Sequence, residues 1–268
     1  MKTVLLAGCG KMGTAMLTGW LEGLEEDLRF IVVDPVLAES HPLAGHEKVD
    51  MHAGLPADLA APDLVVLAVK PQMMAEALPP LVKRASVETV WLSIAAGISI
   101  DGLRQMIAAD AAIIRTMPNT PASIGRGVTA MIATDNVPPH MQELARRMLG
   151  VVGAVVDLDN EADMDAVTAV SGSGPAYVFL LREALEAAGI SAGLKPDLAA
   201  ALAGETIIGA AALLDASEET AAQLRINVTS PGGTTQAALE VLMNDDGMHP
   251  LLKRAVLAAR DRSRALGN

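Results

Sequence analysis

The chain has 268 residues and a formal net charge of −12, and 51% of its residues are hydrophobic although only 2% are aromatic. This length accommodates one or two domains with a full core. The acidic balance, without a basic face, argues against a general binder of nucleic acids or anionic membranes. The single cysteine, Cys9, excludes a disulfide framework within the chain and suits a reducing compartment, so we expect a cytoplasmic protein.

The N-terminus predicts a strand and not a signal peptide, because a glycine-rich loop follows the short apolar run at residues 4–7. Strands are predicted at residues 3–7, 30–34, 64–69, 90–95, 113–117, 128–133 and 154–158, with helical patterns between them. Strands that alternate with helices imply βαβ units and a mainly parallel sheet. No stretch reaches the roughly 18 consecutive apolar residues of a membrane span, so no membrane partner is expected.

The loop after the first strand reads GCGKMG at residues 8–13, a GxGxxG pattern that leads into an amphipathic helix. In this setting the three glycines permit a tight turn, close approach of a pyrophosphate and packing of the helix on the strand. The helix N-terminus adds free N–H groups for phosphates. The pattern predicts dinucleotide binding, and a βα turn that binds no nucleotide is the alternative. The cofactor-binding candidates here are Gly8, Gly10, Lys11, Met12 and Gly13.

Asp34 ends the second predicted strand, where an acid accepts hydrogen bonds from the ribose 2′-hydroxyl of NADH. A 2′-phosphate would meet this carboxylate at close range, and the next basic residue is Lys48. The sequence therefore predicts a cofactor that is NADH or NADPH, with Asp34 favouring NADH.

Beyond about residue 159, alanine-rich helical patterns replace the strands, most clearly at 174–188, 196–214, 234–243 and 250–266. Pro175, Pro196 and Pro250 fit the first turns of helices. We predict an α/β fold in which a Rossmann-type dinucleotide-binding domain (residues 1–159) precedes an all-α domain (residues 160–268). Residues 199–214 are apolar around most of the helix circumference, which predicts an obligate dimer through the C-terminal helices.

Five further strings follow the glycine pattern: AVKP at 68–71, SIAAG at 93–97, RTMPNTP at 115–121, SGSGPAY at 171–177 and TSPGGTT at 229–235. In this order and spacing, the chain resembles pyrroline-5-carboxylate reductase from Val4 to about Leu242. The resemblance implies hydride transfer from NADH or NADPH to the C=N carbon of a cyclic imino acid, 1-pyrroline-5-carboxylate, giving L-proline in the last step of its biosynthesis. It also implies an interleaved homodimer, or a higher homo-oligomer, in which one chain's helical domain completes the other's site.

Candidate cofactor residues stand at the carboxyl ends of strands, where open α/β sheets bind ligands. The resemblance places Val69 and Lys70 against the cofactor, although Lys70 also fits a solvated strand end. The small residues Ala95 and Ala96 let the backbone lie against the nicotinamide. Asn119 binds a ligand or caps a turn.

The loop at residues 229–235 places two glycines and two hydroxyls at a helix start, which predicts a receptor for the substrate carboxylate. An ordinary helix cap is the alternative. The resemblance implies that Thr234 and Thr235 hold the substrate and that Thr235, the catalytic candidate, also reaches the imine nitrogen. The full set of substrate-binding candidates is Ser230, Gly233, Thr234, Thr235, Asn227 and Glu161.

Two rival functions remain, a β-hydroxyacid dehydrogenase and a dinucleotide sensor without turnover. The first carries a catalytic lysine on the helix after the interdomain region, whereas residues 175–188 hold only Arg182 as a basic residue. The intact threonine pair argues against the second. No histidine pattern predicts a metal site. Leu55 and Ile226 depart from the resemblance, which puts a ribose contact near Leu55 in doubt.

Overall fold

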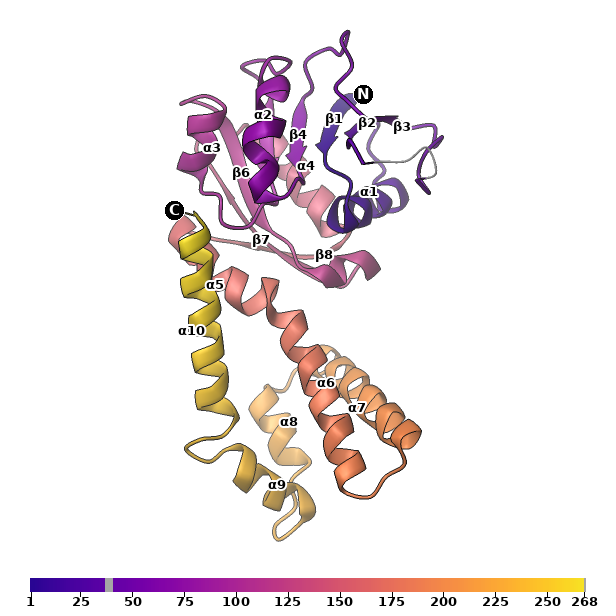
Figure 1. Ribbon diagram of the computed structural model, residues 1–268, viewed down its shortest axis with the longest axis vertical. Helices are drawn as coiled ribbons and strands as arrows, with labels where there is room; N and C mark the ends of the chain where they lie inside the picture. The colour runs from indigo at the N-terminus through magenta and orange to yellow at the C-terminus, as the bar shows by residue number, and fades with distance from the viewer. Residues whose placement is uncertain (37–40, 268) are drawn as a thin grey trace. The chain divides into compact units, whose positions relative to one another are not determined.

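The computed structural model describes residues 1–36 and 41–267 and begins with an eight-stranded sheet in the order β3-β2-β1-β4-β5-β6-β7-β8 (Figure 1). Neighbouring strands are parallel except β6 and β7, and the order 3-2-1-4-5-6 is that of a doubly wound dinucleotide-binding sheet. The strands are β1 (Lys2–Ala7), β2 (Leu28–Val33), β3 (Val49–His52), β4 (Leu64–Leu67), β5 (Val90–Ser93), β6 (Ala112–Met117), β7 (Gly127–Ala133) and β8 (Gly153–Asp157).

The sheet is covered by helices on both faces. Neighbouring residues of a strand point to opposite faces, and both faces of these strands carry apolar side chains. Val4 and Leu6 of β1 belong to one core cluster with α1 and α4, whereas Leu5 and Ala7 belong to the other with α2 and α3. These helices are α1 (Lys11–Gly23), α2 (Met74–Val82), α3 (Ile100–Met106) and α4 (Pro139–Gly150).

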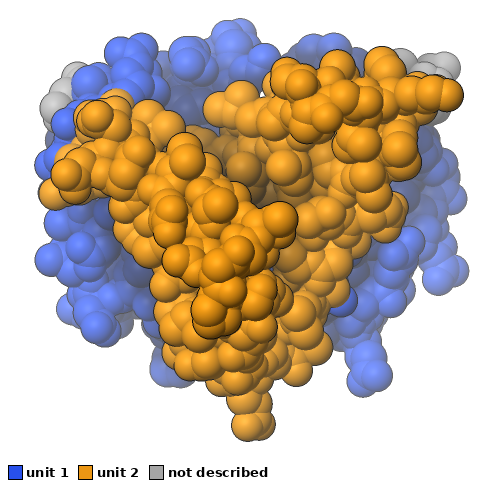
Figure 2. Space-filling model, turned by 90° about the horizontal axis from the view of Figure 1, so that it is seen from below, with its two compact units in different colours: residues 1–173, 259–268 blue, residues 174–258 orange. Residues whose placement is uncertain are grey.

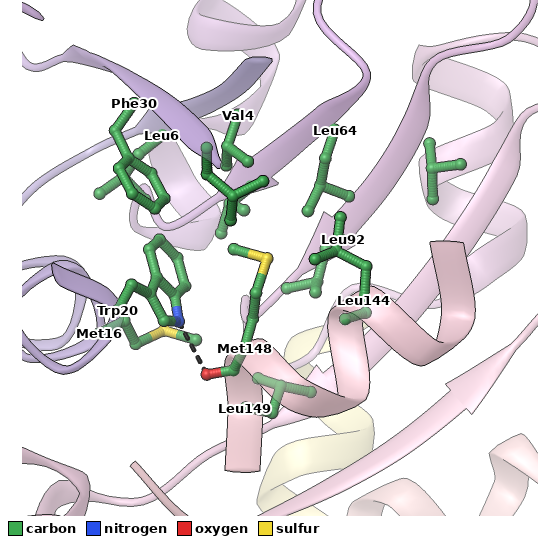
Figure 3. Packing of buried hydrophobic residues seen from close by; sticks show 14 of the residues in the cluster. Val4, Leu6, Met16, Trp20, Phe30, Leu64, Leu92, Leu144, Met148 and Leu149 are labelled. Carbon is green, nitrogen blue, oxygen red and sulfur yellow. Dashed lines mark hydrogen bonds between the residues drawn. The ribbon is translucent and has the colours of Figure 1, made fainter. Parts of the chain in front are cut away.

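The first cluster also fixes α1 against α4. Trp20 of α1 stacks on Phe30 of β2, with ring centroids 5.6 Å apart, and its indole N–H donates to the carbonyl oxygen of Met148 at 2.8 Å (Figure 3). The indole is buried, so this bond satisfies a donor that would otherwise lose its hydration. The helix that carries the glycine pattern is thus held on the sheet at its far end.

All seven predicted strands are present. The additional strand β3, Val-Asp-Met-His, was not predicted, because four residues with one buried apolar side chain give little periodicity. It pairs with β2 at the edge of the sheet, where Asp50 forms an exposed ion pair with Arg29.

The C-terminal part is helical, as predicted, so the predicted fold class is confirmed. The described helices here are α5 (Met164–Val167), α6 (Gly174–Ser191), α7 (Pro196–Ala216), α8 (Ala221–Asn227), α9 (Thr234–Leu242) and α10 (Met248–Gly267). The short helices α5 and α8 were not predicted.

The chain forms two compact units, Met1–Ser173 with Ala259–Asn268, and Gly174–Ala258 (Figure 2). The end of α10 joins the first unit, where the Ser263 hydroxyl donates to Asp165 at 2.7 Å. This division by packing lies after Ser173, whereas the functional division at residues 159/160 stays a prediction.

The unit Gly174–Ala258 leaves most of its large apolar side chains exposed. Its only buried hydrophobic residues among those described are Ala199 and Ala203, while Leu202 is 50% and Ile208 63% exposed. By length and composition α7 is the one helix in the described part of the chain that could cross a membrane. Such a large apolar surface on a helical unit indicates a protein or membrane contact.

Candidate active site

The three glycines of the glycine loop, residues 8–13, have three different environments. Gly8 has φ 88° and a Cβ there would lie 2.8 Å from the Ala68 carbonyl carbon, so the turn requires glycine. A Cβ on Gly13 would lie 2.5 Å from the Gly8 oxygen, whereas one on Gly10 would have no described neighbour within 4 Å. Among the described residues no side chain caps α1, so its first N–H groups have no side-chain acceptor. This cradle fits a dinucleotide pyrophosphate.

Asp34 reaches the glycine loop from the end of β2. One carboxylate oxygen accepts a hydrogen bond from the Cys9 N–H at 2.7 Å, and the other accepts one from the Val36 N–H at 2.9 Å. The residue therefore stands beside the cradle and also orients it. Contact with a ribose stays a prediction.

The middle residues of the loop differ in exposure. Lys11 is exposed on the first turn of α1, and Met12 is half-buried against the core. Cys9 is buried, and burial raises the pKa of its thiol, with the hydrogen bond between this thiol and the Thr14 hydroxyl acting in the opposite direction. The thiol is therefore neutral near pH 7 and adds no negative charge to the glycine loop.

The strand-end candidates lie along one edge of the sheet, because β1, β4, β5 and β6 run parallel. Val69 and Lys70 follow β4, and the first is half-buried while the second is exposed. Ala95 and Ala96 follow β5, and Ala95 is buried. The structure thus brings the candidates of these two strands to the same sheet edge as the glycine loop.

Asn119 follows β6, and both ends of its amide contact the protein. Its Oδ1 accepts from the Val128 N–H at 2.9 Å, and its Nδ2 donates to the Ser171 carbonyl at 3.1 Å. Ser171 lies in a π-helical turn (Thr168–Gly172) that leads to α6, where a Cβ on Gly172 would lie 2.6 Å from the Met117 methyl group. The RTMPNTP and SGSGPAY strings therefore contact each other. These bonds support a structural role for Asn119, and its ligand contact stays a prediction.

Glu161 lies at the start of a short 3₁₀ helix (Glu161–Asp163) and contacts two other elements. Its Oε1 lies 2.5 Å from Nη1 of Arg115 and accepts the Ile100 N–H at 2.7 Å. Sequence reasoning gave Arg115 no role. Its position within a buried strand was the available signal, since a buried guanidinium requires an acidic partner.

The loop predicted to bind the substrate, residues 229–235 and called the substrate loop below, forms a tight turn that opens α9. The Gly233 N–H donates to the Ser230 carbonyl at 3.0 Å, and Gly232 has φ 71°, the conformation that such a turn requires. A Cβ on Gly233 would lie 2.5 Å from the Ser230 hydroxyl. Because α9 begins at Thr234, its first N–H groups have no carbonyl one turn earlier and are available to an anion.

Gln236 was missed as part of this loop. Its side-chain oxygen accepts the Gly232 N–H at 2.7 Å, so it holds the turn from within the first turn of α9. The signal was a Gln three residues after the N-cap Gly233, the position from which a Gln side chain reaches back to the backbone at a helix start.

Asn227 ends α8 in the same compact unit and contacts Glu219 and Gln223. Its Nδ2 lies 2.9 Å from a Glu219 oxygen, and its Oδ1 accepts from Gln223 at 2.8 Å. A groove of about 390 Å³ lies nearby between α8 and α9 and contains Ile226. The predicted substrate contact of Asn227 stays a prediction. No cluster of three metal-ligating side chains occurs within residues 1–36 and 41–267.

Comparison with known proteins accounts for both parts of the chain. The family model for pyrroline-5-carboxylate reductase dimerisation matches residues 161–266, and that for NADP oxidoreductase, coenzyme F420-dependent, matches residues 2–97. The pyrroline-5-carboxylate reductase of Pseudomonas aeruginosa is 36% identical over 263 residues, which are 98% of this chain and 96% of the relative. That of Synechocystis is 44% identical over 205 residues, 76% of this chain and 75% of the relative.

Solved structures agree over the full length. A pyrroline-5-carboxylate reductase from Coxiella burnetii matches with a TM-score of 0.89 at 30% identity, covering 100% of this chain and 99% of the other. A pyrroline carboxylate reductase from Plasmodium falciparum with NADP bound matches with a TM-score of 0.84 at 28% identity, covering 100% of both chains. Since sequence and structure agree across both the sheet and the helical part, the chain belongs to the pyrroline-5-carboxylate reductase family.

Proposed function

We propose that this chain reduces 1-pyrroline-5-carboxylate to L-proline with NADH or NADPH. The observation that carries the proposal is the presence, in a member of this family, of both an open glycine cradle and a glycine turn that presents helix N–H groups. The bound dihydronicotinamide supplies a hydride to the C=N carbon, and the ring nitrogen of the protonated imine keeps its proton as the amine of proline. The chain's own residues therefore bind and orient the reactants.

The substrate loop binds the imino acid by its carboxylate. The free N–H groups at the start of α9 and the hydroxyls of Thr234 and Thr235 are hydrogen-bond donors. They attract an anion locally although the net charge of the whole chain is −12. Thr235 also donates toward the imine nitrogen, where the lone pair develops as the hydride arrives.

The test is oxidation of NADH or NADPH, followed at 340 nm, on addition of pyrroline-5-carboxylate and with proline identified as the product. A β-hydroxyacid dehydrogenase would instead respond to a β-hydroxyacid with NAD⁺ or NADP⁺. A sensor would bind the cofactor without turnover. Either of those results, with no proline formed, overturns the proposal.

Replacement of Thr235 by Val is expected to lower kcat/KM for the imine while leaving NAD(P)H affinity nearly unchanged. The variant keeps the side-chain shape but loses one hydrogen bond, at a cost of about 1–3 kcal/mol. Thr235→Ser restores the hydroxyl and should recover most of the loss. Steady-state kinetics on the three proteins measure this, and an unchanged kcat/KM in the Val variant removes Thr235 from the reaction.

Asp34 gives a preference for NADH, because its carboxylate stands at the cradle where a 2′-phosphate would lie. Asp34→Ser is expected to raise the ratio of kcat/KM for NADPH to that for NADH by about tenfold, which corresponds to about 1.4 kcal/mol. The substitution should also weaken the binding of both cofactors, because the Cys9 N–H loses its acceptor.

The matched control for this variant is Asp50→Ser, which removes an exposed carboxylate on the neighbouring strand. Its cofactor ratio should equal that of wild type. A wild-type enzyme that strongly prefers NADPH would show that Asp34 does not contact the ribose 2′-hydroxyl. An Asp34→Ser variant with an unchanged ratio of kcat/KM for the two cofactors would show the same.

The dimerisation match indicates a homo-oligomer, and the C-terminal helices form its interface in this proposal. The support is the large exposed apolar surface of α6 and α7, which lie side by side and bury little of it (Figure 1). A second copy covering these helices explains the apolar α7 without a membrane, in keeping with a cytoplasmic enzyme.

A further inference from the structure

The Arg115–Glu161 pair joins three segments of the first compact unit. The Arg115 side chain is 7% exposed on β6, and that of Glu161 is 29% exposed. A single carboxylate oxygen, Oε1, accepts from both the Arg115 guanidinium and the Ile100 N–H. Hydrogen bonds of charged groups are stronger than neutral ones, and loss of one partner would leave the other charge buried and unpaired.

This pair fixes one end of the β5–α3 loop, residues 94–99. Ile100 is the first residue of α3, so Glu161 binds the helix start from outside, while the Ser99 hydroxyl caps it from within by accepting the Gly102 N–H at 3.0 Å. The other end is also fixed, because the Thr116 hydroxyl donates to the Ser93 carbonyl at 2.9 Å. The loop is therefore held at both ends by β6 and the segment at Glu161.

Neither member of the pair is free to bind the substrate carboxylate. The guanidinium of Arg115 is buried and contacts Glu161, and the carboxylate of Glu161 would repel an anionic imino acid. The pair is neutral as a unit, so it adds no net charge at the sheet edge. Its contacts point to the loop as the element on which it acts.

We infer that Arg115 and Glu161 are positioning residues that hold the β5–α3 loop, and with it Ala95 and Ala96, in place for the nicotinamide ring. The inference rests on the proposed function, because that function is what places a nicotinamide ring at this loop. It replaces direct substrate binding as the role of Glu161 with an action through Arg115 and Ile100. The pair thereby controls the rate of hydride transfer more than the affinity for the imino acid.

The test is a double-mutant cycle on the full-length protein, with Arg115→Met, Glu161→Met and the combined Arg115→Met/Glu161→Met variant. Each single variant leaves one charged or polar group unpaired, whereas the combined variant replaces both with apolar side chains of similar length and preserves folding. We expect each single change to lower kcat about tenfold with less than about a twofold change in KM for the imine. The combined loss should be at least about threefold smaller than the product of the single losses.

A second readout does not depend on turnover. Bound NADPH changes its nicotinamide emission when the ring is held, so Glu161→Gln should reduce this emission change while the dissociation constant moves less than about threefold. The control is Glu143→Gln, which removes an exposed carboxylate that pairs with Arg147, and all its parameters should equal those of wild type.

A Glu161→Gln variant that raises KM for the imine with kcat and emission unchanged would show direct substrate binding and overturn the inference. Multiplicative losses in the cycle would overturn it as well. If wild type forms no proline, the proposed function fails, and the NADPH emission of Glu161→Gln still decides whether the pair positions the loop.

Discussion

Gly10→Ala is expected to fold as wild type does and yet to lose at least about tenfold in affinity for NADH and NADPH, or about 1.4 kcal/mol. No described residue beyond its chain neighbours lies within 4 Å of a Cβ at this position, and its φ of −65° suits alanine. The methyl group would instead occupy the open side of the cradle, where the backbone must approach the pyrophosphate. Thermal unfolding and fluorescence titration of the cofactor measure the two effects separately.

Gly13→Ala should lower the stability of the fold, whereas Gly10→Ala lowers cofactor affinity. The Cβ at position 13 would lie 2.5 Å from the Gly8 oxygen, a backbone atom that cannot move aside cheaply, so the substitution should lower Tm by several degrees, equivalent to about 1–3 kcal/mol. Gly150→Ala is the matched control, since position 150 is open and lies at the end of α4, and it should leave both Tm and affinity unchanged. Normal cofactor binding by Gly10→Ala would show that no dinucleotide lies against this loop.

Leu198→Glu/Leu202→Glu is expected to dissociate the oligomer to monomers and to abolish turnover. The two leucines lie four residues apart on α7 and are 49% and 50% exposed, so they share one face of the helix. Burial of each in a subunit interface contributes about 1.5–3 kcal/mol, and a carboxylate there adds a desolvation cost. Light scattering across a concentration series, with activity assayed on the same samples, measures the effect.

Val87→Glu is the control for this change, because Val87 is 99% exposed and lies outside the helical unit. It should remain oligomeric and active. A double-glutamate variant that stays oligomeric would place the interface elsewhere, and an active monomer would show that each chain completes its own site.

Local patterns in the sequence determined the fold class and the glycine loop. GxGxxG between a strand and a helix specifies a turn whose steric requirements lie within a few residues, and the structure shows those requirements at Gly8 and Gly13. Apolar runs such as residues 64–67 likewise predict strands covered on both faces, because their burial is a property of the run itself. The helix start at Thr234 followed from two glycines and two hydroxyls for the same reason.

Contacts between residues distant in the sequence were decided only by the tertiary structure. Glu161 is 46 residues from Arg115 and 61 from Ile100, and no local pattern encodes which buried guanidinium or helix start its carboxylate meets. Asn119 likewise joins Ser171, 52 residues away. A side chain's residue type states which hydrogen bonds it can form, but its partner depends on which strand ends and helix starts the fold brings to the same place.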